Sequence, residues 1–155
     1  MKLSIKINIF IILIIFVQYL PFSLNVKYQY IPEILSLVMY ITYSLHRKSL
    51  SYFNLTLLSL LNDIINPCCM GVYTIQYLIY AIYIDRFKKQ YYSDNLLIGW
   101  LGFFVLNIAL LPCKYILLNL IQGYDITFDI LILKKTLITI AWFPMVYYFI
   151  NKFVR

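Results

Sequence analysis

Long apolar runs separated by short basic loops dominate this chain. Between Lys48 and Asp85 lie 36 residues that carry one charge, Asp63. A single helix of that length would measure about 54 Å, whereas the hydrocarbon core of a bilayer is about 30 Å thick. The run therefore has to fold back once, and Pro67 and Gly71 supply the break, because proline lacks an N–H and glycine tolerates positive φ. The pattern predicts two membrane helices joined by a tight turn.

Further apolar runs extend this pattern along the chain. Residues 7–26 and 95–113 carry no charge, and polar turns separate the remaining runs. We therefore predict an all-α integral membrane protein, a single polytopic domain over residues 1–155 with about six transmembrane helices in one bundle. The approximate spans are 7–24, 32–45, 50–65, 71–85, 95–112 and 136–150.

Two parts of this layout stay open. Residues 114–135 mix apolar and polar positions, and we interpret them as an outer connection with an interfacial helix. In the competing interpretation the fifth helix continues to Ile121 with a kink at Pro112. Lys134 and Lys135 are placed outside, and if they lie inside the span count becomes odd, five instead of six.

Composition narrows the class of protein. The chain has 155 residues, of which 63% are hydrophobic and 12% charged, and its mean hydropathy is +0.83. A soluble domain carries about 25% charged residues, so this chain cannot cover a globule with polar surface. The composition indicates an integral membrane protein with no room for a soluble domain.

The formal net charge of +7 comes from basic residues in short loops between apolar runs. Such residues set topology and contact anionic lipid, and no basic patch stands clear of the membrane, which argues against nucleic-acid binding. Nine of them fall in predicted inner loops and four in outer ones, which predicts that both termini are cytoplasmic. The inner set is Lys2, Lys6, Arg47, Lys48, Arg86, Lys88, Lys89, Lys152 and Arg155, and the outer set is Lys27, Lys114, Lys134 and Lys135.

Asp63 is the acid placed inside a long apolar run, about one helical turn before the predicted bend. It either makes a polar contact with another helix or a partner subunit, or it is a hydrated side chain at headgroup depth, and the sequence leaves both open. Asn66 either hydrogen-bonds Asp63 or belongs to ordinary turn chemistry. Gly71 is expected where the next helix leaves the turn, close to a neighbouring backbone.

Other candidate residues have simpler interpretations. Tyr73, Tyr77 and Tyr80 recur at helical spacing beside Gln76, and packing is favoured over a ligand-stacking face in a chain with 16 tyrosines. No acid–base pair, nucleophile–histidine arrangement or phosphate-binding glycine loop is present, so we expect a non-enzyme without a cofactor. His46 and the three cysteines do not have metal-site spacing.

The order of these signals resembles a known family, the rod shape-determining protein MreD family. Pro32 and Glu33 resemble the residues that open its second helix, where proline suits the first turn and an acid meets the positive end of the helix dipole. Residues 60–65, followed by Gly71, resemble its aspartate-containing hairpin, and residues 133–155 resemble its last helix. Two departures are Ser59 and Asn62 in place of the usual glycines, and Pro67-Cys68 in place of the first glycine of the turn.

The resemblance implies a fold similar to the substrate-binding components of energy-coupling-factor transporters. It implies a non-catalytic subunit of the bacterial inner membrane that maintains cell shape by scaffolding peptidoglycan synthesis with the bitopic protein MreC. Indirect partners would be an actin-like filament and cell-wall synthases. The alternative is a small-molecule (vitamin-type) binding subunit of a transporter. The basic loops, expected to face the filament or anionic lipid, contain Arg47, Lys48, Arg86, Lys88 and Lys89.

Overall fold

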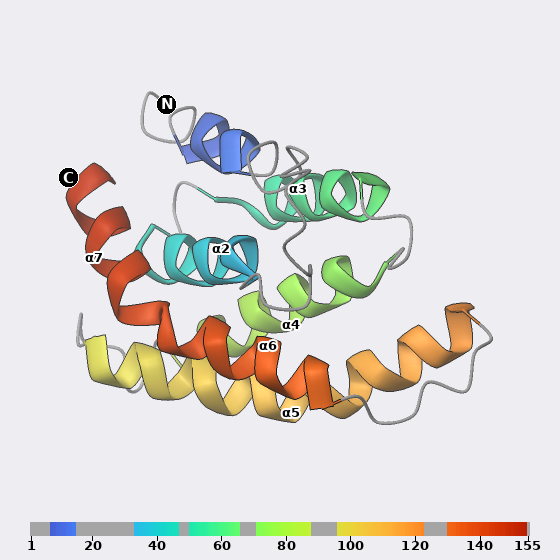
Figure 1. Ribbon diagram of the computed structural model, residues 1–155. Coiled ribbons are helices and arrows are strands. Elements are labelled where there is room, and N and C mark those ends of the chain that lie inside the picture. The colour runs from blue at the N-terminus through green and yellow to red at the C-terminus, as the bar shows by residue number, and fades with distance from the viewer. Residues whose placement is uncertain are drawn as a thin grey trace, which may run out of the picture.

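The computed structural model describes residues 7–14, 33–46, 50–65, 71–87, 96–122 and 130–154. Within these ranges all regular secondary structure is helical, so the all-α prediction is confirmed (Figure 1). Residues 7–14 form a short helix near the N-terminus. The other helices are α2 (Ile34–Leu45), α3 (Tyr52–Ile65), α4 (Val72–Phe87), α5 (Leu96–Gln122), α6 (Ile130–Ala141) and α7 (Phe143–Val154).

Helices α2 to α7 alternate in direction from one predicted span to the next. Tyr80 of α4 donates a hydrogen bond to Asn107 of α5. Tyr73, which comes earlier in α4, packs its ring against the ammonium group of Lys114, which comes later in α5. The two helices are therefore antiparallel. In Figure 1, α2, α4 and the pair α6–α7 run one way, and α3 and α5 run the other. These alternating helix directions are expected of a chain that crosses a membrane repeatedly.

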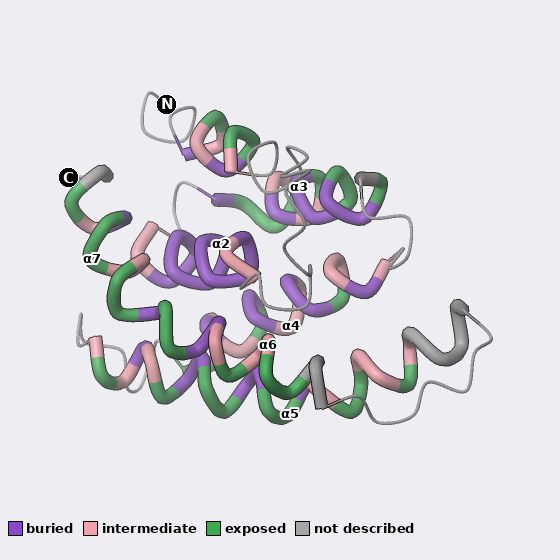
Figure 2. Tube along the Cα trace, in the orientation of Figure 1, coloured by how far each residue is buried: buried purple, intermediate pink, exposed green. Residues whose placement is uncertain are grey.

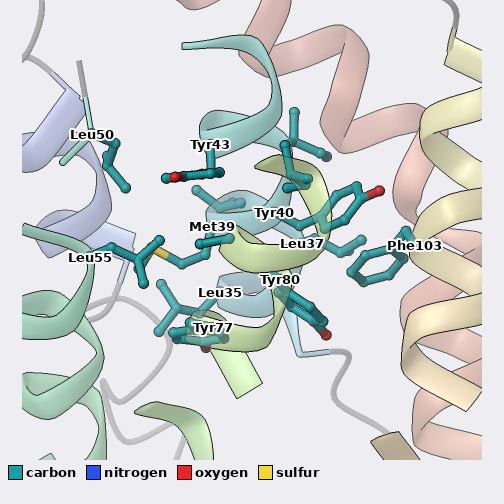
Figure 3. Close-up of a cluster of buried hydrophobic side chains, with 14 of the residues drawn as sticks. Leu35, Leu37, Met39, Tyr40, Tyr43, Leu50, Leu55, Tyr77, Tyr80 and Phe103 are labelled. Carbon is teal, nitrogen blue, oxygen red and sulfur yellow. The ribbon is translucent and has the colours of Figure 1, made fainter. Parts of the chain in front are cut away.

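Helix α2 is the centre of the bundle. Every residue from Leu35 to Ser44 is buried, and Figure 2 shows this helix buried along its length. A largely apolar helix of this kind is stable when other helices cover it on every side. The Tyr40 ring lies 5.6 Å from Tyr80, 5.0 Å from Phe103 and 6.1 Å from Phe143, centroid to centroid. Tyr40 thus packs α2 against α4, α5 and α7, and the first two contacts can be followed in Figure 3.

The outer surface of the bundle carries many large apolar side chains. Phe53 of α3 is 74% exposed, Val105 of α5 56%, and Tyr148 of α7 70%. An extended apolar exterior of this kind is typical of a surface covered by lipid or by a partner. By length and composition alone, one helix in the described ranges is long and apolar enough to cross a membrane: Leu96–Leu117, with mean hydropathy 2.2. The six spans remain a prediction.

Helix α5 does not end at residue 112, as the favoured sequence interpretation had it. It continues through Pro112 to Gln122, which agrees with the competing interpretation. Proline removes one backbone donor, the one that would bond to the carbonyl of Ile108, and the helix continues past this position. An interfacial helix separate from α5 is therefore not formed by residues 115–121.

The last predicted span, 136–150, is two helices instead of one. α6 ends at Ala141 and α7 begins at Phe143, with Trp142 between them. Pro144 has no N–H to offer the carbonyl of Ile140, and the indole N–H of Trp100 on α5 donates to that carbonyl at 3.1 Å. The break is therefore stabilised by a side chain from another helix.

Candidate functional site

Asp63 closes the hairpin made by α3 and α4. Its side chain accepts hydrogen bonds from the backbone N–H of Tyr73 at 3.2 Å and of Thr74 at 3.1 Å, and from the Thr74 hydroxyl. The first N–H groups of a helix have no partner within the helix, and they carry the positive end of its dipole. The carboxylate thus caps α4 from outside that helix. Asp63 is 2% exposed, so it is buried against α4 and not hydrated.

Gly71 begins α4 with a conformation that other residues rarely adopt. Its φ is +84°, and its carbonyl accepts the N–H of Ile75 at 3.0 Å. The expected dihedral is therefore present, whereas the expected close approach to a backbone is wrong. No described atom lies within 4 Å of the position that a Cβ would occupy. Glycine is required here by the dihedral and not by packing.

Glu33 forms a charged cluster with two lysines from other helices. Its carboxylate lies 2.9 Å from Lys114 Nζ on α5 and 3.6 Å from Lys135 Nζ on α6. Its backbone N–H donates to the Thr139 hydroxyl at 3.0 Å. Glu33 occupies the N-cap position of α2, where its charge was expected, but its side chain makes no hydrogen bond to the first N–H groups of the helix. The ion pairs are therefore an addition to the predicted dipole role. We call Glu33, Lys114 and Lys135 the Glu33 cluster; it joins the N-terminus of α2 to α5 and α6.

The Glu33 cluster and the Asp63 cap lie at the same end of the bundle. Lys114 Nζ stands 5.7 Å from the centroid of the Tyr73 ring, and the backbone N–H of Tyr73 is one of the donors to Asp63. Two carboxylates and two ammonium groups therefore hold five helices together there. The lysines were assigned to this side from the sequence, but the ion pairs were not anticipated, because Glu33 and Lys114 are 81 positions apart.

Asp85 occupies the opposite end. Its carboxylate accepts hydrogen bonds from the hydroxyls of Tyr43, at 3.3 Å, and of Tyr52. These contacts connect the end of α2 and the start of α3 to the last turn of α4. The sequence interpretation used Asp85 only to mark the end of an apolar run. The neighbouring Arg86 is exposed.

A polar cluster lies inside the bundle between α4 and α5. The Tyr80 hydroxyl donates to Asn107 Oδ1 at 2.8 Å and accepts from the Gln76 amide, and Asn107 Nδ2 donates to the Phe103 carbonyl at 2.8 Å. Gln76, Tyr80 and Asn107 are all buried. Gln76 Oε1 has no hydrogen-bond partner among the described residues. Tyr77 and Tyr80 pack as favoured from their spacing, whereas Asn107 was missed as one polar residue in an apolar run.

Several candidate residues fall outside the described ranges. Among the described residues, no group of three His, Cys, Asp or Glu side chains could hold a metal ion. Cys113 is exposed and free. The candidates outside the described ranges are Pro32, Arg47, Lys48, Asn66, Pro67, Lys88 and Lys89.

The fold and these contacts define a helical bundle with charged groups at its two ends and a largely apolar middle. The chain matches no protein-family model, no curated protein and no solved structure.

Proposed function

We propose that this chain is a non-catalytic, multi-pass subunit of the bacterial inner membrane that belongs to the rod-shape (elongation) complex. It would help to maintain cell shape by scaffolding peptidoglycan synthesis together with the bitopic protein MreC. Six spans with both termini cytoplasmic, in a fold similar to the substrate-binding components of energy-coupling-factor transporters, are part of this proposal. The basic loops would face the actin-like filament or anionic lipid.

The distribution of charge supports the membrane location. The Glu33 cluster and Asp63 gather at one end, Asp85 and Arg86 at the other, and large apolar side chains are exposed between them. A bilayer requires this arrangement, because charged groups are costly in hydrocarbon and backbone groups must be satisfied within helices. The alternating helix directions agree with a chain that crosses repeatedly.

The observation that carries the role in the complex is the α3–α4 hairpin closed by Asp63. The densest part of the resemblance to the MreD family, residues 60–65 with Gly71, falls on this hairpin. The cap fixes how α3 enters α4, so it also fixes the outward face of α3, which exposes Phe53, Leu57 and Ile64. A partner helix that packs on this face needs the two helices in one fixed arrangement.

Capture from solubilised bacterial membranes tests this role. Asp63→Asn keeps the shape of the side chain and removes its charge, which weakens the cap by about 1 kcal/mol. We expect recovery of MreC with the tagged chain to fall by roughly fivefold, and cells to become round, while the amount of inserted protein stays normal. Arg86→Lys, an exposed change that keeps its charge, is the control and should leave recovery unchanged. Undiminished recovery with Asp63→Asn, in rod-shaped cells, would contradict the role.

A second function, a vitamin-type binding subunit of a transporter, draws support from the Gln76, Tyr80 and Asn107 cluster. Buried polar groups that converge within an apolar bundle are what a small-molecule site requires, and Gln76 Oε1 is unpartnered within the described ranges. The same capture separates the two functions. Recovery of an ATPase module instead of MreC would favour the transporter.

A further inference from the structure

An apolar groove opens on the surface of the bundle between residues 7–14, α2 and α7. Its volume is about 390 Å³, and its walls include Phe10, Ile34, Trp142 and Phe149. All of the side chains that line it are aliphatic or aromatic except the thioether of Met145. Helix α7 forms most of one wall because the break at Trp142 turns it away from α5 and towards α2 (Figure 1).

We propose that this groove holds one acyl chain of an anionic phospholipid, whose head group is bound by Lys152. The proposal rests on the proposed membrane location and not on the partners of the chain. The lining favours a hydrocarbon occupant, because it is apolar or aromatic throughout. An unbranched hydrocarbon chain is narrow enough to enter.

The groove runs along α7 towards Lys152. From Trp142, on its wall, to Lys152 the chain rises about 15 Å along α7. An acyl chain lying along α7 would therefore extend over about this distance from a head group at Lys152.

The charge at the end of the groove selects the head group. Lys152 lies three and four positions after Phe149 and Tyr148, so it is on the same face of α7, one turn beyond the groove. It is exposed, and it belongs to the last turn of the helix. An ammonium group at this place would meet the phosphate of a lipid whose chain fills the groove.

Native mass spectrometry of the purified full chain in detergent, supplied with phosphatidylglycerol or phosphatidylcholine, tests the proposal. Val146→Trp fills the groove, and Val105→Trp places the same side chain on the exposed surface of α5. We expect Val146→Trp to retain about tenfold less phosphatidylglycerol than Val105→Trp, the loss that follows when roughly two methylene groups lose their contacts. Lys152→Gln should remove the preference for phosphatidylglycerol over phosphatidylcholine and keep chain binding.

A second variant keeps the test decisive if Val146→Trp does not fold. Met145 also lines the groove and is 67% exposed, so Met145→Trp introduces bulk without disturbing the core, and it should likewise reduce lipid retention. Equal retention by the groove variants and by Val105→Trp would overturn the proposal, and so would equal retention of the two lipids by the unmodified chain. The assay contains no partner protein, so its outcome is independent of MreC capture.

Discussion

Asp63 and Gly71 lie on either side of one turn, and both act on the backbone of α4. The carboxylate accepts the N–H groups of Tyr73 and Thr74, and Gly71 supplies the positive φ from which the helix starts. These roles could be predicted, because they depend on residues within about ten positions of one another. The pairing of Glu33 with Lys114 and Lys135 could not, because it depends on how distant helices pack.

Substitution of Gly71 separates a requirement for the dihedral from a requirement for space. Gly71→Ala should lower the free energy of unfolding in detergent by about 1 kcal/mol, because a Cβ disfavours positive φ even where nothing lies nearby. Gly71→Asn should lower it less, because asparagine adopts this conformation more readily. Denaturant titration of the purified chain measures both. Equal losses in the two variants, or a larger loss in Gly71→Asn, would contradict the dihedral explanation.

Among the elements, the break between α6 and α7 shows what a local pattern leaves undetermined. Pro144 is visible in the sequence, yet residues 136–150 were predicted as one helix. Whether a proline merely kinks a helix or divides it depends on what satisfies the freed carbonyl and what packs on either side. Here the freed carbonyl of Ile140 accepts a hydrogen bond from Trp100, which lies 40 positions earlier in the chain. In the same way, the continuation of α5 beyond Pro112 was one of two outcomes compatible with the pattern.

A double-mutant cycle tests the stabilisation of this break. Trp100→Phe leaves the Ile140 carbonyl without the indole donor and should reduce the free energy of unfolding by about 1–2 kcal/mol. Pro144→Ala restores a backbone N–H for that carbonyl, so in this background Trp100→Phe should cost much less. Chemical denaturation of the four proteins gives the coupling energy. Additive losses would show that the indole N–H does not stabilise the break.

For the molecule as a whole, the number and order of the apolar runs were readable from the sequence, whereas the position of each helix in the bundle was not. The apolar composition of the runs did not distinguish α2, which is buried from Leu35 to Ser44, from α5, whose exposed face includes Val105. Lys135 forms an ion pair with Glu33, so the start of α2 and the first half of α6 lie at the same end of the bundle. That grouping agrees with the predicted layout, in which both lie outside.

Reporter fusions in living bacteria test the proposed membrane architecture most directly. Fusions at Asn25, Gln90, Gly123 and Arg155 sample four predicted connections, using a reporter active only outside the cytoplasm and a second active only within it. Because the predicted inner loops hold nine basic residues and the outer ones four, we expect Asn25 and Gly123 to report outside, and Gln90 and Arg155 to report inside. An outward-facing Gln90 or Arg155 would contradict the six-span arrangement on which the proposed function rests.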